Sequence, residues 1–269
     1  MISALVGIPV VVGAIWWGAP WLTVLVAAAA VLGVREAYRL LPPGIGPFPV
    51  TLGALWAIAL VLGAQAGSGL GNFLLISAGI LAAGAFIALL WFVAFYSGGR
   101  YLVAGIFLVG GPVYVAFLLG HSLPLREIGV GGDLGRNWLL FALLVTFATD
   151  TGAFFSGRLL GRHALAPGIS PNKTWEGGAG GLIWAVFAAV ALGLIFDLVI
   201  PRWQQAVIGA TVGVVSQWGD LFESKLKRLS LVKDAGGIVP GHGGILDRLD
   251  SVVVSVPVVY YLVATVFKP

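Results

Sequence analysis

The charged residues of this sequence gather in one stretch near its C-terminal end, residues 224–251, SKLKRLSLVKDAGGIVPGHGGILDRLDS. This stretch holds five of the 15 Lys and Arg residues and three of the 11 Asp and Glu residues. Its centre, residues 236–244, contains five glycines and Pro240, and we expect a helix to begin near Ile245. Glycine backbones bring their N–H groups close to a ligand, and a helix N-terminus favours anions. The stretch therefore predicts a phosphate-binding loop.

Two carboxylates follow this loop at the start of the expected helix, Asp247 and Asp250. They would repel a bare phosphate, whereas a hard cation such as Mg²⁺ binds one or two carboxylates together with phosphate oxygens and water. The alternative is helix capping, because an Asp in a first turn stabilises a helix by about 0.3–1 kcal/mol. Capping accounts for one Asp, but it leaves the neighbouring Arg248 and His242 unexplained. We therefore expect a cation between these carboxylates and a phosphate.

A second polar set lies just upstream, in DLFESKLKR, where Asp220 ends an apolar run and Lys227 follows seven residues later. If the helix continues past the apolar run, positions i, i+3, i+4 and i+7 share one face. These positions hold Asp220, Glu223, Ser224 and Lys227. The alternative is a solvated amphipathic turn with an Asp–Lys ion pair.

A third polar stretch, GRLLGRHALAPGISPNKTWEGG, spans residues 157–178. Its polar residues are Arg158, Arg162, His163, Ser170, Lys173, Thr174 and Glu176. Asp150 precedes it near the expected edge of the membrane, where an acidic residue is a functional candidate by default. The alternative is a hydrogen-bonded cap, with Asp150 paired to Thr146 or Thr149. Together the three stretches indicate carboxylates for a metal, and Lys and Arg for phosphate oxygens, at membrane level.

The elements that must position these residues are apolar. The chain is 59% hydrophobic and 10% charged, whereas typical soluble domains have roughly 25% charged residues. This composition predicts an all-α, polytopic integral membrane bundle, and a span takes about 20 residues. Nine apolar runs fit this description, although the first and third are short and eight or ten segments stay open alternatives. The runs are 2–17, 20–41, 50–64, 71–96, 101–121, 136–156, 180–200, 204–220 and 251–267.

The distribution of basic residues predicts the orientation of these segments. With nine segments, the two long polar loops, 156–180 and 220–250, follow segments six and eight and lie on one side. Eleven of the 15 basic residues lie on that side, which places it and the N-terminus in the cytoplasm. No basic residue precedes Arg35, so we expect a retained first helix rather than a cleaved signal peptide. We divide the chain into N-terminal transmembrane helices, 1–135, and a C-terminal catalytic region, 136–269.

Several function classes are excluded by what the sequence lacks. It has no cysteine, which removes thiolate catalysis and disulfides. The P-loop pattern GxxxxGK[ST], the zincin pattern HExxH and the nucleophile elbow GxSxG are all absent. The net charge of +4 suits a surface on anionic lipid, and without a basic soluble domain we expect no nucleic-acid partner.

The polar residues also form a long, specifically spaced block: Ser224-Lys225-Leu226-Lys227-Arg228, Lys233-Asp234, Pro240-Gly241-His242-Gly243-Gly244 and Asp247-Arg248-Leu249-Asp250. This block resembles the signature of the phosphatidate cytidylyltransferase family, also called CDP-diacylglycerol synthases. The run Ser170–Gly177 is similar to the family's second motif, with Asn172 where Lys is common, and Asp150-Thr151 is similar to a third. The resemblance covers residues 145–260, and the first 140 residues match only as several apolar helices.

The resemblance implies a reaction of CTP with phosphatidate that gives CDP-diacylglycerol and pyrophosphate, for phospholipid biosynthesis. It implies dependence on Mg²⁺, with K⁺ as an additional cation in some members, and a homodimer in the inner membrane with a cytoplasm-facing site. It implies that Asp220 and Asp247 are the metal ligands. Catalytic roles are expected for Asp220, Asp247, Lys227, Arg228 and His242. Substrate-binding roles are expected for Ser170, Lys173, Thr174, Glu176, Ser224, Lys233, Arg248, Asp250 and Asp150.

Two alternatives stay open. One is another CTP-using membrane enzyme, such as a polyprenol kinase or a synthase acting on an isoprenoid ether lipid, which would share the metal and nucleotide but differ in acceptor. The other is a transporter or channel, which predicts charges inside helices at mid-membrane. The sequence shows no clear case of such a charge.

Overall fold

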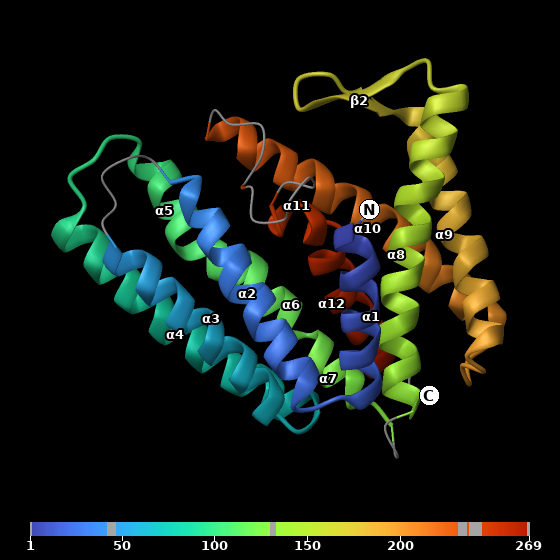
Figure 1. Ribbon diagram of the computed structural model, residues 1–269, viewed down its shortest axis with the longest axis horizontal. Coiled ribbons are helices and arrows are strands. Elements are labelled where there is room, and N and C mark those ends of the chain that lie inside the picture. Colours follow the sequence, from blue (N-terminus) through green and yellow to red (C-terminus); the bar gives the residue numbers. More distant parts are fainter. Residues whose placement is uncertain (1, 42–46, 130–132, 231–235, 237–243, 268–269) are drawn as a thin grey trace. The chain divides into compact units, whose positions relative to one another are not determined.

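The computed structural model describes residues 2–41, 47–129, 133–230, 236 and 244–267 (Figure 1). The α-helices are α1 (Ile2–Trp17), α2 (Trp21–Arg39), α3 (Pro47–Ala66), α4 (Gly69–Phe95), α5 (Tyr101–Pro112), α6 (Leu118–Gly120), α7 (Ser122–Arg126), α8 (Asp133–Leu160), α9 (Trp175–Ile195), α10 (Arg202–Leu229), α11 (Leu246–Leu249) and α12 (Val252–Tyr261). The other elements are the π-helical segments η1 (Val113–Phe117) and η2 (Leu262–Val266) and the strands β1 (Ala164–Ala166) and β2 (Ser170–Thr174).

Seven helical stretches among the described residues are long and apolar enough to cross a membrane. They are Trp21–Arg39, Pro47–Ala66, Gly69–Phe95, Tyr101–Arg126, Asp133–Leu160, Trp175–Ile195 and Leu246–Val266. They confirm a helical, polytopic membrane protein and correspond to seven of the nine predicted segments. The first predicted segment is the shorter helix α1, and the eighth lies in α10, whose last turns are charged. Nine crossings therefore stay a prediction.

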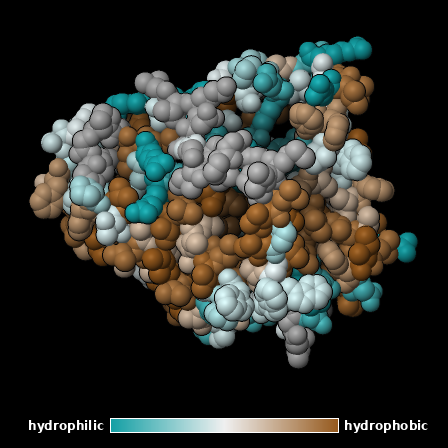
Figure 2. All heavy atoms as spheres, in the orientation of Figure 1, coloured by the Kyte–Doolittle hydropathy of each residue, from teal (hydrophilic) through white to brown (hydrophobic). Residues whose placement is uncertain are grey.

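The surface over these helices is apolar. Large hydrophobic side chains are exposed along several of them, among them Phe86, Val93, Leu102 and Phe187. Figure 2 shows the broad apolar areas that such side chains form on the face in view. Water would not accept apolar patches of this extent on a monomer, whereas the hydrocarbon core of a bilayer does. The protein is a multi-pass membrane protein.

The chain divides into two compact units. The first consists of residues 1–124 and 227–249, and the second consists of residues 125–226 and 250–269. The end of α10 and the short helix α11 therefore belong to the same unit as α2. The sequence-based division at residue 135 follows the expected functions of the two parts of the chain and stays a prediction.

In the first unit, α2 packs against α1, α3 and α5, and one hydrogen bond between α2 and α5 repairs a helix interruption. Pro112 has no backbone N–H, so it leaves the carbonyl of Leu108, four residues earlier, without its helical donor. The hydroxyl of Tyr38 in α2 donates to this carbonyl oxygen at 2.7 Å. The chain after Pro112 then forms the π-helical turn η1. A neighbouring helix thus satisfies a backbone group that lipid would leave bare.

In the second unit, α8 and α9 lie side by side (Figure 1). Glycines allow this close contact: a Cβ on Gly157 would lie 3.4 Å from the Cα of Gly177, and a Cβ on Gly181 would lie 3.0 Å from the carbonyl oxygen of Thr149. Small residues at such contacts are typical of helix pairs in membranes, where association depends on close packing. The contact fixes the end of α8 beside the start of α9.

A short antiparallel hairpin joins α8 to α9. Ala164 pairs with Thr174 and Ala166 pairs with Ser170. The sequence predicted only a polar loop over 156–180, but α8 extends to Leu160 and α9 begins at Trp175. The predicted helical class therefore holds with a small β addition, in the stretch that carries the second motif.

Candidate active site

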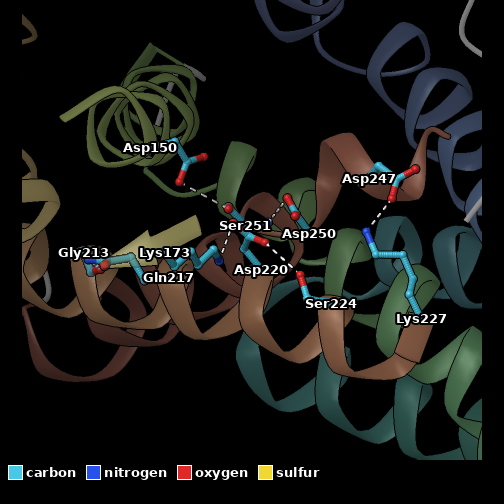
Figure 3. Close-up of polar contacts among 10 residues, drawn as sticks. All are labelled: Asp150, Lys173, Gly213, Gln217, Asp220, Ser224, Lys227, Asp247, Asp250 and Ser251. Atoms are coloured by element: carbon cyan, nitrogen blue, oxygen red, sulfur yellow. Dashed lines mark hydrogen bonds and ion pairs between the residues drawn. The ribbon is translucent and has the colours of Figure 1, made fainter. Parts of the chain in front are cut away.

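An ion pair joins the second motif to α10. The Nζ of Lys173 in β2 lies 2.5 Å from Oδ2 of Asp220, and the two side chains are 25% and 36% exposed. Ser224, one turn further along α10, donates to Oδ1 of Asp220 at 3.4 Å. Figure 3 shows Lys173 and Ser224 meeting the two sides of this carboxylate. The sequence predicted all three residues for the site, and the structure brings them together.

Two further carboxylates belong to the same group. Asp250 lies between α11 and α12 and accepts a hydrogen bond at 2.7 Å from the backbone N–H of Ser251. The hydroxyl of Ser251 donates to Oδ1 of Asp150 at 3.4 Å. Asp150 and Asp250 both interact electrostatically with Asp220 and with Lys173. We call Asp150, Lys173, Asp220, Asp250 and Ser251 the acidic cluster; its three carboxylates face one ammonium group, so it attracts cations.

Asp150 does not form the cap considered as an alternative. The hydroxyl of Thr146 donates to the carbonyl oxygen of Ala142, and that of Thr149 donates to the carbonyl oxygen of Val145, both at 2.8 Å. Both hydroxyls thus bond within their own helix, as Thr side chains in helix interiors commonly do. The partner of Asp150 is Ser251, which the sequence did not single out.

Two residues of α10 fix the position of this helix next to the other elements that carry the acidic cluster. The Nε2 of Gln217 donates to the carbonyl oxygen of Gly178 at the start of α9, at 3.1 Å, and to that of Gly213 at 2.8 Å. A Cβ on Gly219 would lie only 2.6 Å from the carbonyl oxygen of Asp250. A side chain at this position would therefore push α10 away from the turn that carries Asp250.

The base of the hairpin is fixed by two residues with predicted substrate-binding roles. The hydroxyl of Thr174 caps α9 by accepting from the N–H of Gly177 at 3.1 Å. The Glu176 carboxylate accepts from the backbone N–H groups of Arg162 and His163, at 3.1 and 3.3 Å, and its Oε1 lies 2.6 Å from Nδ1 of His163. These contacts position Lys173, and the substrate-binding roles of Thr174 and Glu176 stay predictions.

A second ion pair lies in the first unit. The Nζ of Lys227, near the end of α10, lies 2.6 Å from Oδ1 of Asp247 in α11, and the side chains are 14% and 13% exposed. The backbone N–H of Gly244 donates to Oδ2 of the same aspartate at 2.9 Å. The helix continues past Asp220 to Leu229, whereas the predicted segment ended at residue 220 and a loop was expected from there. The Asp–Lys pair within that turn, considered as an alternative, is not the pair that forms. Lys227 pairs with Asp247, and Asp220 pairs with Lys173 (Figure 3).

Glu36 of α2 is a residue of this region that the sequence analysis missed. Its side chain is fully buried, and its Oε2 accepts a hydrogen bond from the backbone N–H of Leu246 at 2.8 Å. A Cβ on Gly236 would lie 2.6 Å from Oε1, and a Cβ on Gly244 would lie 2.6 Å from Oε2. The available signal was one acidic residue inside an apolar run, which is unexpected in a membrane helix.

The helix predicted to begin near Ile245 is the four-residue helix α11, followed by a break at Asp250 and Ser251. Described N–H groups at its start, those of Gly244 and Leu246, are taken by carboxylates rather than left for a phosphate. The exposed Arg228 and Arg248 lie in α10 and α11, and Ser170 begins β2. The predicted residues Lys233 and His242 lie outside the described residues.

The donors fit a divalent cation shared with a substrate better than an ion enclosed by protein. In the described part of the chain, no group of three or more His, Asp or Glu side chains lies close enough to hold a metal ion. Mg²⁺ binds through one or two carboxylates and completes its shell with phosphate oxygens and water. Asp220 and Asp247 offer hard carboxylate oxygens of this kind, and each is paired with a lysine, a residue type that also binds phosphate oxygens.

Comparisons with known proteins agree with this chemistry. The sequence profile of the Cytidylyltransferase family matches residues 1–266. A phosphatidate cytidylyltransferase of Bacillus subtilis (strain 168) is 40% identical over 158 residues, which is 59% of this chain and 58% of that protein. One from Staphylococcus saprophyticus is 47% identical over 128 residues, 48% of this chain and 49% of that protein. One from Brucella suis biovar 1 is 37% identical over 198 residues, 72% of this chain and 68% of that protein. The chain thus spans 58% and 49% of the length of the first two relatives.

Proposed function

The chain belongs to the cytidylyltransferase family, and we propose that it transfers CMP from CTP to phosphatidate, giving CDP-diacylglycerol and pyrophosphate for phospholipid biosynthesis. The observation that carries this proposal is the family match over residues 1–266, which extends the resemblance of residues 145–260 into the first half of the chain. The names of the three relatives support the acceptor, because each is a phosphatidate cytidylyltransferase.

The proposed reaction is a nucleotidyl transfer between two anions. A phosphate oxygen of phosphatidate attacks the α-phosphorus of CTP, and the bond from that phosphorus to the bridging oxygen of the β-phosphate breaks. Pyrophosphate leaves with the electron pair, and the attacking oxygen needs little help from a general base because it is already ionised. Catalysis then consists mainly of positioning the reactants and neutralising their charge.

The two lysine–aspartate pairs supply groups for both tasks. We assign Lys173 and Lys227 to the phosphate oxygens of CTP and the leaving pyrophosphate, because ammonium groups bind such oxygens strongly. We assign Asp220 and Asp247 as Mg²⁺ ligands, and the bound cation would supply charge neutralisation at the nucleotide phosphates. The acidic cluster supports the assignment of Asp220, because the carboxylates of this cluster outnumber its ammonium group. A second, monovalent cation such as K⁺ is part of the same proposal.

The membrane arrangement completes the proposal. The acyl chains of phosphatidate stay in the bilayer, which accounts for a nucleotidyl transfer by a multi-pass protein. We propose nine crossings, counting α1 and α10, with the N-terminus and the loops 156–180 and 220–250 in the cytoplasm, and a homodimer in the inner membrane.

The orientation and the dimer are tested separately from the reaction. Because the chain has no cysteine, one introduced thiol reports its own side of the membrane. Gly168 is exposed in the hairpin between α8 and α9, and a Cβ added there would meet no atom within 4 Å. In Gly168→Cys, an impermeant maleimide should label the thiol only from the cytoplasmic side. The native mass of the detergent complex tests the dimer.

The reaction is tested with purified protein, Mg²⁺ and CTP labelled at either the α- or the γ-phosphate. The lipid panel contains phosphatidate, diacylglycerol, a polyprenol and a phosphorylated isoprenoid ether lipid. We expect the α-label to enter the lipid phase with phosphatidate, with release of one pyrophosphate per lipid. Asp247→Asn serves as the inactive variant, and Lys225→Gln, an exposed change on α10, serves as the matched control. Transfer of the γ-label would instead identify a lipid kinase, and preference for the isoprenoid lipid would replace the proposed acceptor.

A further inference from the structure

Glu36 is an isolated acidic residue in the first half of the chain. It is one of 11 acidic residues, and the next one along the sequence is Glu127. It lies in α2, a candidate membrane span, and none of its side chain is exposed. A buried carboxylate in such a helix is costly unless it has partners and a function.

The partners of Glu36 are 210 residues away along the sequence. Its Oε2 accepts from the backbone N–H of Leu246 at 2.8 Å, which is the first residue of α11. Gly236 and Gly244 approach the two carboxylate oxygens so closely that a Cβ on either would lie 2.6 Å from an oxygen. Glu36 therefore contacts the chain on both sides of residues 237–243, and only glycine leaves room for it at these two positions.

The same short segment presents Asp247. Leu246, bonded to Glu36, is its immediate neighbour, and the N–H of Gly244 donates to Oδ2 of Asp247. The other oxygen of Asp247 is held by Lys227. Lys227 thus fixes the end of the aspartate side chain, whereas the backbone from which that side chain projects is fixed by Glu36.

We propose that Glu36 is a positioning residue that sets the backbone of residues 244–246 and thereby the direction of the Asp247 carboxylate. It acts through Leu246 and the two glycines and touches no reacting atom. Its importance for catalysis rests on the proposed function, in which Asp247 is a Mg²⁺ ligand. The effect of Glu36 on the backbone of residues 244–246 does not depend on the proposed function. The backbone effect and the catalytic effect are therefore measured separately.

The backbone hold is tested by thiol labelling, because the chain has no cysteine. Ile245→Cys places one partly buried thiol between Gly244 and Leu246. Adding Glu36→Ala should raise the labelling rate about tenfold, since a buried hydrogen bond to a charged group is lost and the segment opens locally more often. Glu36→Gln keeps an acceptor oxygen and should raise the rate less. Ser97→Cys, an exposed thiol in the same unit, should label equally in all backgrounds.

The matched control for Glu36 is Arg39→Gln, an exposed change one turn further along α2, which should leave the labelling of Ile245→Cys unchanged. Equal labelling rates with the native Glu36, with Glu36→Gln and with Glu36→Ala would overturn the proposal. A rise of the same size at Ser97→Cys would also overturn it, because that would indicate general loosening of the unit.

The catalytic consequence is read from the Mg²⁺ dependence of CMP transfer. Glu36→Ala should raise the Mg²⁺ concentration for half-maximal rate about tenfold, with Glu36→Gln between it and the wild type. An unshifted Mg²⁺ curve together with faster labelling would separate Glu36 from metal binding and overturn that part. If the wild-type protein transferred no CMP, the proposed function would fail while the labelling result still decided the backbone hold.

Discussion

The acidic cluster and the Lys227–Asp247 pair are built from the same residue types in opposite electrostatic balance. In the acidic cluster, three carboxylates share Lys173, and the central Asp220 is 36% exposed. In the pair, one carboxylate meets one ammonium group, the two side chains are only 14% and 13% exposed, and a backbone N–H adds a further bond. The first arrangement carries excess negative charge, whereas the second is neutral within itself.

This difference separates what a substitution does to folding from what it does to activity. Removing one carboxylate from the acidic cluster relieves repulsion between like charges. Removing one partner of a largely buried pair takes away the opposite charge that faces the other partner. The acidic cluster is therefore expected to bind cations but to lower the stability of the fold. The Lys227–Asp247 pair is expected to contribute to both stability and activity.

The largest effect is expected at Asp247. Asp247→Asn keeps the shape of the side chain but removes the charge proposed to bind Mg²⁺, so the rate of CMP transfer should fall about 100- to 1000-fold. Initial rates at saturating CTP and ordinary Mg²⁺ measure it. A rate like that of the wild type would leave Asp247 with a role in folding alone and end the proposed metal role.

A smaller loss is expected at Asp220. Asp220→Asn should lower the rate about 10- to 100-fold, partly recovered at high Mg²⁺, because one proposed ligand becomes a neutral amide. The melting temperature should stay equal or rise, because Asp150 and Asp250 lose a repulsive neighbour. Rates across a Mg²⁺ series and thermal unfolding in detergent measure the two effects. A large drop in melting temperature would show that the two regions do not differ in the way described above.

The pair should show the opposite behaviour when its lysine is removed. Lys227→Met leaves Asp247 partly buried without its ammonium group, and it should lower the free energy of unfolding by about 1–3 kcal/mol. Lys225→Met is the control, because this neighbouring side chain is exposed on the same helix. Equal melting temperatures for the two variants would contradict a stabilising role for the pair.

A smaller effect on CMP transfer is expected at Lys173. Lys173→Ala should raise the KM for CTP about tenfold, because one charge-assisted contact to phosphate is lost. The maximal rate should change less than it does in Asp220→Asn. An unaltered CTP dependence would mean that Lys173 only balances the acidic cluster.

The smallest effect is expected far from both regions, at the hydrogen bond that repairs α5. Tyr38→Phe removes the donor to the Leu108 carbonyl oxygen, and bonds of this kind in membrane bundles average about 0.6 kcal/mol. Thermal unfolding beside the exposed Tyr101→Phe control measures it. If Tyr38→Phe lowered the free energy of unfolding as much as Lys227→Met, the ion pair would contribute no more to stability than an ordinary hydrogen bond.

The sequence predicted the helical membrane class and the motif residues, because long apolar runs and a spaced polar block are local signals. It ended the eighth segment at residue 220 and expected a loop from there, whereas α10 continues to Leu229, and the helical spacing past Asp220 was stated only as a condition. It did not predict the partners of the charged residues. Lys227 was placed near Asp220 on the same helix, but packing between elements gives it Asp247.

The hairpin and Glu36 escaped prediction for different physical reasons. Strands of three and five residues are too short for alternation to be recognised. Glu36 has no motif around it, and its contacts come from a segment 210 residues away. Residues whose role depends on such distant contacts leave only indirect signs in sequence, here one acidic side chain in an apolar helix.

The separation between Glu36 and Leu246 has a consequence for how the protein is made. At about 5–20 residues per second, a ribosome needs roughly 10–40 s to synthesise the 210 residues between them. During that interval α2 has been synthesised, but the carboxylate of Glu36 lacks the hydrogen bond from the backbone N–H of Leu246. Nascent chains arrested before residue 246 should therefore be degraded faster than arrested chains carrying Glu36→Leu, which pulse-chase labelling would detect. Synthesis of Leu246 would then be the step that supplies the hydrogen-bond partner of Glu36.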